Sequence, residues 1–147
     1  MRASSIRLAD PRVLELNGAV RSVPEPHVDW YVGVAPEAEP SGSERVVIAT
    51  LHIRGANGGC DVIVGSRMIH PNARKVETED FSRALEDSDA LEALYDFARI
   101  QARVILATLE VADAVPAAAP KPEFSSLASA EDDETDNHED EGTSATT

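Results

Sequence analysis

The chain has 147 residues and a single cysteine, Cys60. One thiol cannot form a disulfide within the chain. The sequence also opens without a charged segment followed by an apolar stretch and a small-residue cleavage site, so we expect no secretory leader. Both observations favour a reducing compartment, and we expect the protein in the cytoplasm.

Positive charge is scarce, because 13 Lys and Arg residues stand against 27 Asp and Glu residues, for a formal net charge of −14. Residues 131–147 contain eight of the acidic residues and no Lys or Arg. Proteins that follow phosphate groups need clustered cations, so we expect no nucleic-acid partner. Long apolar runs are missing too, and none approaches the roughly 20 residues that span a bilayer. We therefore expect a soluble protein.

The N-terminal part of the chain is predicted to form strands. The first are Ser5–Leu8 and Val13–Val20, and Asp10 and Pro11 lie between them. Since proline lacks an amide donor, Pro11 suits an edge or a bend in one long strand. A short helix over 10–17 is the alternative.

Three more strands follow from alternation of apolar and polar residues. Val28–Val34 alternates cleanly, and residues 35–44 form a Pro-, Gly- and Ser-rich acidic loop. Arg45–Arg54 is apolar on both faces in its first half. Residues 56–59 (Ala-Asn-Gly-Gly) predict a tight turn, because Asn and Gly accept positive φ angles. The strand Cys60–Ile69 then completes a hairpin.

After Pro71 the period becomes helical, with Thr78 capping a short helix, Glu79–Glu86, and Ser88 capping a long helix to about Asp113. The long helix has an apolar stripe at i, i+3, i+4 and i+7 spacing. A second apolar set falls outside this stripe: Phe97, Ile100, Val104 and Val111. One stripe suffices to cover one sheet, so we assign Ile100, Val104 and Val111 to an interface between subunits.

The C-terminal part divides into two segments. Ala114–Pro122 contains three prolines and predicts an extended segment, which ends near Phe124 and Leu127. The residues beyond it have the low hydrophobicity and high charge of a disordered tail. We place one domain at 1–127 and an acidic tail at 128–147.

Catalytic chemistry has little support in the sequence. His27, His52, His70 and His138 are scattered, and we expect no metal site and no catalytic site among them. No phosphate loop, Rossmann fingerprint or nucleophile elbow occurs. Cys60 begins a strand without a basic neighbour and is expected to be inert. We therefore expect a binding protein, with no enzymatic activity and no cofactor.

Five residues are candidates for contact with a client or partner. Trp30 and Tyr31 lie on opposite faces of a strand, and Phe97 lies outside the helix stripe. Val46 and Ile48 form one apolar face of the strand Arg45–Arg54. The alternative for Trp30 is a core position beneath the long helix.

Two motifs resemble the SecB-like protein-export chaperone family. Leu94–Arg99, LYDFAR, is similar to the start of that family's main helix, and Val115–Phe124, VPAAAPKPEF, to the proline-and-phenylalanine segment that follows it. The order of elements agrees over roughly residues 4–127. The chain differs in having no glycine around 108–111, and its acidic C-terminus lacks the basic, cysteine-bearing zinc tail of some members.

The resemblance implies an α+β fold, in which a four-stranded antiparallel sheet is followed by a short and a long helix packed on one face. It also implies an ATP-independent holdase that assembles as a dimer of dimers and binds unfolded or pre-export polypeptides in apolar grooves. Three alternatives stay open. They are dedicated chaperoning within a toxin–antitoxin pair, a structural or adaptor subunit of a phage or other particle, and, ranked last, a small α+β enzyme.

Overall fold

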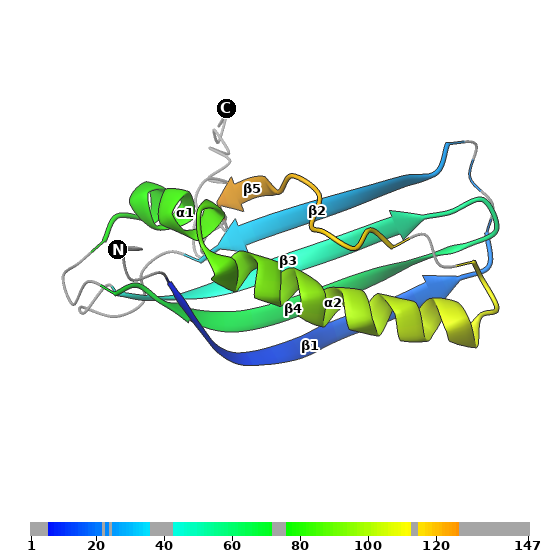
Figure 1. Ribbon diagram of the computed structural model, residues 1–147, viewed down its shortest axis with the longest axis horizontal. Helices are drawn as coiled ribbons and strands as arrows, with labels where there is room; N and C mark the ends of the chain where they lie inside the picture. Colours follow the sequence, from blue (N-terminus) through cyan, green and yellow to red (C-terminus); the bar gives the residue numbers. More distant parts are fainter. Residues whose placement is uncertain are drawn as a thin grey trace, which may run out of the picture.

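A computed structural model of the chain describes residues 6–21, 23, 25–35, 43–71, 76–112 and 115–126. The predicted acidic tail, 128–147, lies outside these residues. In chain order the described elements are β1 (Arg7–Ala19), β2 (His27–Val34), β3 (Glu44–Arg54), β4 (Gly59–Ile69), α1 (Thr78–Glu86), α2 (Asp89–Thr108) and β5 (Glu123–Ser126). Both helices lie on one face of a single sheet (Figure 1). None of the described helices is long and apolar enough to cross a lipid bilayer.

The strand order in the sheet is β1-β4-β3-β2-β5. Strands β1 to β4 pair antiparallel with their neighbours, whereas β5 pairs parallel with β2, Val32 opposite Phe124. The predicted α+β class with helices on one face is confirmed, but the four-stranded antiparallel sheet is wrong. The sheet has five strands and is mixed, because the proline-bearing segment returns along the free edge of β2.

Strand β1 is one long, irregular strand, and the short helix considered over residues 10–17 does not form. Its pairing with β4 shifts register between Ala9 and Arg12, where Asp10 has a φ of 49°. The hydroxyl of Ser66 donates a hydrogen bond of 2.7 Å to the carbonyl oxygen of Ala9, beside this bulge. Pro11, which has no amide donor, thus lies where the ladder is already interrupted.

The predicted hairpin of β3 and β4 is confirmed. Its register runs without a shift from Glu44 opposite Ile69 to Arg54 opposite Gly59. The turn is closed by a hydrogen bond of 2.9 Å from the amide of Gly55 to the carbonyl oxygen of Gly58. This hairpin forms the centre of the sheet, so its two faces determine which side chains the helices cover.

The core lies between the sheet and the helices. On β3 the odd-numbered side chains from Val47 to Ile53 are fully buried, and α2 contributes the predicted stripe. The buried residues of α2 are Ala90, Leu91, Leu94, Tyr95, Ala98, Ala102 and Leu106. Helix α2 lies over β4 and β1 (Figure 1).

Helix α1 is fixed to the end of the sheet by a buried arginine. The guanidinium of Arg45 donates a hydrogen bond of 2.6 Å to the carbonyl oxygen of Val76 and lies 5.7 Å from the ring centre of Phe81. Phe81 and Leu85 are the buried side chains of this helix. A short helix with two buried residues therefore gains its position from both packing and a cation–π contact.

The helix boundaries differ in detail from the sequence prediction. Thr78 is the first helical residue of α1 rather than its cap, and Ser88, although at the N-cap of α2, makes no capping hydrogen bond. Helix α2 ends at Thr108 instead of Asp113. The amide of Val111 returns to the carbonyl oxygen of Leu106, and Glu110 adopts a φ of 55°. A non-glycine residue in this left-handed conformation ends the helix.

Residues 115–122 run back beside α2 toward the edge of the sheet. The hydroxyl of Tyr95 donates a hydrogen bond of 2.7 Å to the carbonyl oxygen of Pro116. The amide of Ala119 donates one of 3.2 Å to a carboxylate oxygen of Glu92. These two contacts guide the extended segment from the end of α2 to β5.

Candidate functional site

The face of the sheet opposite the helices is covered by no described element. Five apolar residues lie on it, and we call them the outer patch: Leu14, Tyr31, Val46, Ile48 and Ile63. Leu14, Val46 and Tyr31 are 54%, 47% and 41% exposed. A monomeric soluble protein rarely leaves a contiguous apolar surface of this kind without a use for it.

The strand register makes the outer patch contiguous. Tyr31, Thr50 and Ile63 form one cross-strand row, and Gly33, Ile48 and Gly65 form the next. Because Gly65 has no side chain, Leu14 of β1 leans over it, so that Leu14, Val46 and Ile48 line a shallow hollow of about 240 Å³.

Charged groups flank the hollow. Arg67 forms ion pairs with Asp10 at 2.6 Å and with Glu44 at 3.1 Å, and these contacts raise the pKa of its guanidinium. At the other end of the sheet, Asp29 lies next to Tyr31. Loss of contact with water and the charge of Asp29 raise the pKa of the Tyr31 hydroxyl. The patch is thus an apolar strip between two polar ends.

The five predicted contact residues separate into two groups. Tyr31, Val46 and Ile48 come together in the outer patch. Trp30 is only 1% exposed and meets Tyr95 edge to face, with ring centres 5.4 Å apart, so it lies in the core as the alternative had it. Phe97 is partly buried against the core from α2, on the other side of the sheet.

A second exposed apolar surface lies on α2. Ile100 and Val104, which are one helical turn apart, are 59% and 58% exposed. We call them the helix flank. The third predicted interface residue, Val111, is partly buried, and its Cγ2 atom lies against Gly58 of the hairpin turn. Val111 therefore closes the core in this structure, whereas the helix flank remains open.

Sequence reasoning missed the exposed apolar residues of β1. Leu14, Leu16 and Val20 are 54%, 45% and 67% exposed. They lie on or next to the edge of the sheet, and no described strand pairs with the outer side of β1. The signal was present as the apolar spacing of 13–20, but two register shifts against β4, near Asp10 and at Leu14, hide which residues point to which face of the sheet.

Cys60 offers no nucleophile. Its side chain is buried, and this burial raises the pKa of the thiol to about 11. A thiol with such a pKa is protonated at neutral pH, and it is the thiolate that reacts.

Two of the histidines lie close together, because His27 and His52 meet on one face of the sheet beside Asp29. The expectation that they are scattered is wrong for this pair.

Comparison with known proteins identifies a structural neighbour. No protein-family model matches the chain, and no curated protein sequence matches it significantly. Among solved structures, the chain is similar to the SecB-like chaperone Rv1957 of Mycobacterium tuberculosis, solved in complex with a ChAD peptide from the Rv1956 HigA1 antitoxin. The TM-score is 0.53 and the sequence identity 21%, over 73% of this chain and 85% of that one.

The fold is similar to that of a SecB-like chaperone. The resemblance found in the sequence is thus supported at the level of the fold, as a distant match.

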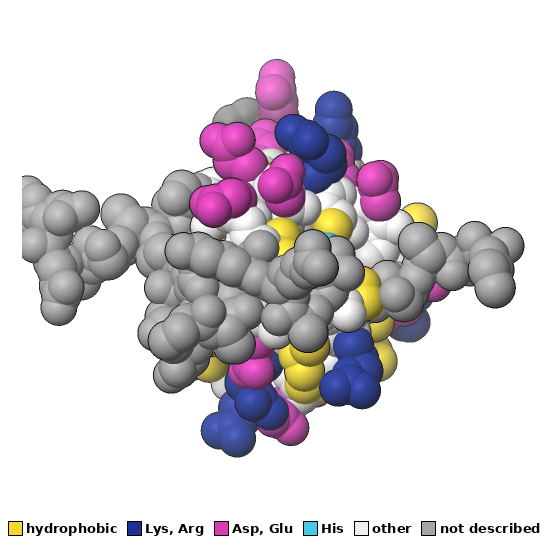
Figure 2. Space-filling model, turned by 90° about the vertical axis from the view of Figure 1, so that its left-hand side faces the viewer, with side chains coloured by type: hydrophobic (Ala, Val, Ile, Leu, Met, Phe, Trp, Pro, Cys, Tyr) yellow, Lys and Arg dark blue, Asp and Glu magenta, His cyan; other side chains and the backbone are white. Residues whose placement is uncertain are grey.

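Acidic side chains gather around α1. Figure 2 shows them in its upper part, with basic side chains among them. Glu79, Asp80 and Glu86 of this helix are all exposed. Helix α1 lies on the helix side of the sheet, so this acidic surface and the outer patch are separate regions (Figure 1).

Proposed function

We propose that the protein is an ATP-independent chaperone, a holdase that binds unfolded or pre-export polypeptides in the cytoplasm. The observation that carries the proposal is the outer patch, an apolar surface that the helices of this chain leave uncovered, on a fold similar to that of a SecB-like chaperone. We propose no enzymatic activity, because binding in such a groove needs no catalytic group.

The outer patch suits an extended chain of loosely defined sequence. Burial of apolar surface is non-directional and contributes about 25 cal/mol per Å² removed from water. The shallow hollow at Leu14, Val46 and Ile48 accepts a large apolar side chain without requiring one particular shape. The neighbouring edge of β1 offers backbone donors and acceptors, so that an extended client can add to the sheet as a further strand.

The helix flank supports the oligomeric part of the proposal. Ile100 and Val104 lie on the side of α2 that faces away from the sheet core, so they do not compete with the outer patch. Packing of two such helices against each other would bury both residues of each copy in a symmetric contact. We propose that this contact forms one dimer, and that a second contact between copies completes a dimer of dimers.

Dedicated chaperoning of an antitoxin is a narrower form of the same function. The structural neighbour was solved with a peptide from an antitoxin, which favours this form. Client selectivity distinguishes the two. A general holdase protects many denatured proteins, whereas a dedicated chaperone protects one partner and leaves unrelated proteins to aggregate.

The experiment combines mass and client binding on the full chain. Static light scattering should give the mass of an oligomer. In a second measurement, a chemically denatured model protein is diluted into buffer without nucleotide, with and without an excess of the chain. We expect aggregation to be suppressed. Unchanged aggregation of several model proteins, together with a monomeric mass, would reject the general holdase.

An apolar dye distinguishes the remaining alternative, a structural or adaptor subunit. In such a subunit the outer patch is filled permanently by a neighbour in the assembly. The purified oligomer would then bind no apolar dye. A holdase with a free outer patch should bind the dye, and an unfolded polypeptide should displace it.

A further inference from the structure

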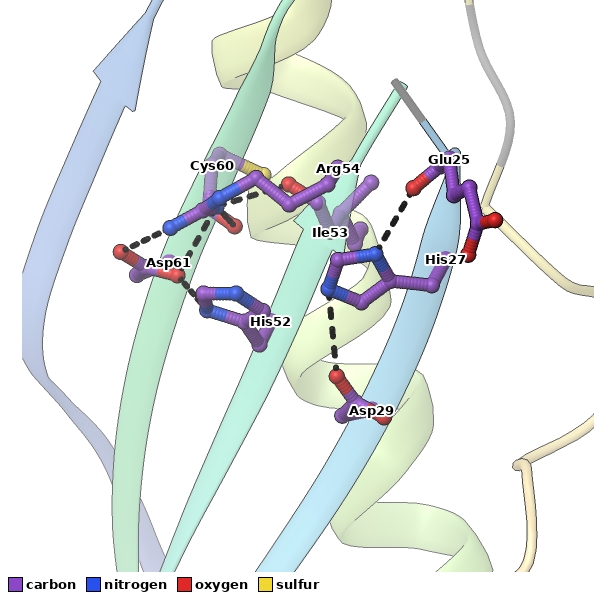
Figure 3. A network of polar contacts seen from close by, with 8 residues as sticks. All are labelled: Glu25, His27, Asp29, His52, Ile53, Arg54, Cys60 and Asp61. Atoms are coloured by element: carbon purple, nitrogen blue, oxygen red, sulfur yellow. Dashed lines mark hydrogen bonds and ion pairs between the residues drawn. The ribbon is translucent and has the colours of Figure 1, made fainter. Parts of the chain in front are cut away.

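Two histidines and an aspartate meet on the outer face of the sheet, where the N-terminal end of β2 pairs with the C-terminal end of β3 (Figure 3). Asp29 lies directly opposite His52 across the two strands, and His27 precedes Asp29 by two residues, so it points to the same face. One ring nitrogen of each histidine and one carboxylate oxygen of Asp29 all lie within 4.8 Å of one another.

The contacts of His27 determine which of its nitrogens has a free lone pair. The Nδ1 atom lies 2.9 Å from the carbonyl oxygen of Glu25 and must carry the proton, because a carbonyl can only accept. In the neutral ring, Nε2 is then an acceptor. This Nε2 atom lies 3.5 Å from Oδ2 of Asp29, which is an acceptor too. The two lone pairs point toward the same small region, where a metal ion could accept both.

His52 is oriented by a carboxylate in the same manner. Its Nδ1 atom contacts Oδ1 of Asp61, so the proton lies on Nδ1 and the lone pair of the neutral ring on Nε2. Arg54 holds Asp61 in place with two hydrogen bonds, of 3.2 Å and 3.1 Å. A histidine whose second nitrogen donates to a carboxylate or a carbonyl oxygen is the usual arrangement behind a metal-binding imidazole.

One of the three ligand–ligand distances already suits a small transition-metal ion, and all three lie within 4.8 Å. Zinc binds imidazole nitrogen and carboxylate oxygen at about 2.0–2.2 Å, which in a tetrahedron places neighbouring ligand atoms about 3.3–3.5 Å apart. The distance of 3.5 Å between His27 Nε2 and Asp29 Oδ2 already meets this requirement. The side chains of His27, Asp29 and His52 are 49%, 32% and 28% exposed, so an ion can enter and water can complete its coordination.

We propose that His27, Asp29 and His52 form a binding site for a divalent transition-metal ion of the Zn²⁺ class, with Glu25 and Asp61 orienting the two imidazoles. The donor set of two imidazoles and one carboxylate favours zinc over magnesium or calcium, which prefer oxygen ligands. The site ties β2 to β3 across the outer face. It does not depend on the proposed chaperone function.

The proposed site borders the outer patch. Asp29 lies between His27 and Tyr31 on β2, and the side chains of these alternate residues point to the same face of the sheet.

The test is calorimetric titration of the full chain, purified without a histidine tag, with ZnCl₂. We expect one ion per chain for the wild type, and a loss of affinity of at least tenfold in the variants His27→Gln and His52→Gln. Asp61→Asn, which removes the carboxylate that orients His52, should lower the affinity about 10- to 100-fold. His70→Gln, outside the cluster, and His138→Gln, in the acidic tail, are matched controls with unchanged affinity.

Two further measurements on the same samples distinguish the loss of a metal ligand from poor folding of a variant. Thermal unfolding in chelator-treated buffer checks that the variants retain the wild-type Tm without metal. In the wild type, Co²⁺ should give the visible absorption of a low-symmetry four-coordinate site, and this band should be absent in His52→Gln. Zinc affinity that survives both His27→Gln and His52→Gln, or no zinc binding by the wild type, would overturn the proposal and leave the cluster as a set of ion pairs.

Discussion

The first half of strand β3 carries apolar residues on both faces of the sheet, in different surroundings. On the helix side, Leu51 and Val47 have an exposed fraction of 0%, because the helices lie on this face of the sheet (Figure 1). On the outer side, Val46 of the same strand is 47% exposed. In this half of β3 the alternation is therefore between two apolar sets, and the core contains only one of them.

Under the proposed function, this difference separates stability from binding. A side chain that is already buried contributes to folding, whereas an exposed apolar side chain is available for another chain. We therefore expect substitutions on the helix side to lower the free energy of unfolding, and substitutions on the outer side to weaken client binding.

The largest expected effect comes from a cavity on the helix side. Leu51→Ala should lower the free energy of unfolding by about 2–5 kcal/mol, because the truncated side chain leaves a void among packed neighbours. Val46→Ala, on the outer side of the same strand, should change it by no more than about 0.5 kcal/mol. Urea denaturation followed by Trp30 fluorescence measures both, and equal losses would contradict the assignment of the two faces.

Glycines on the two faces provide a second contrast. A methyl group added to Gly18 of β1 would lie 2.5 Å from Cγ2 of Ile105 and 2.9 Å from Cδ1 of Leu109, so these side chains or the helix that carries Ile105 must shift. Gly18→Ala should cost about 1–3 kcal/mol, the usual range for overpacking. At Gly65 the nearest atom is Cδ1 of the half-exposed Leu14, at 3.0 Å.

Leu14 can move into solvent, so Gly65→Ala should be nearly neutral in the same urea titration. It should also fill part of the hollow on the outer patch. A loss of stability at Gly65 as large as that at Gly18 would mean that the outer face is packed against something in solution, and the mass from light scattering would then show a partner copy.

Much of this contrast was predictable from the sequence. The alternation of residues in Arg45–Arg54 placed Val46 and Ile48 on the face opposite Val47 and Ala49, and the Asn-Gly sequence predicted the hairpin turn. Both signals are local in the sequence, so they can be recognised without the structure. The helix stripe separated the core residues of α2 from Ile100 and Val104 in the same manner.

The rest depends on pairing between distant segments, which local periodicity does not encode. The fifth strand was missed because parallel pairing of Phe124 with Val32 is decided by packing of a proline-bearing segment. The meeting of His27 with His52 depends on the register of β2 against β3 across an intervening loop. In β1 the register shifts near Asp10 and at Leu14 change which side chains face outward, so Leu14 could not be assigned to the outer patch.

A charge on the outer patch tests its role in binding. Val46→Asp should weaken capture of an unfolded polypeptide about tenfold, or about 1.4 kcal/mol, because the carboxylate loses water when the client covers it. Ala93→Asp adds the same charge at an exposed position of α2 and serves as the control with unchanged capture. Fluorescence anisotropy of a labelled unfolded protein measures both, and equal affinities would place the client elsewhere.

The smallest expected effect concerns two tyrosines on opposite faces at alkaline pH. Burial raises the pKa of Tyr95 to about 12, above the value of about 10 expected in the unfolded chain. The unfolded state then loses its proton first, so this residue stabilises the fold fully below about pH 10 and progressively less as the pH rises toward 12.

Tyr95→Phe should flatten the decline in the free energy of unfolding between about pH 10 and 12. Tyr31→Phe, which removes a hydroxyl from the outer face, should flatten it less, and urea titrations at successive pH values compare the two slopes. A larger change in Tyr31→Phe would show that the outer face, and not the helix side, holds the more strongly buried hydroxyl.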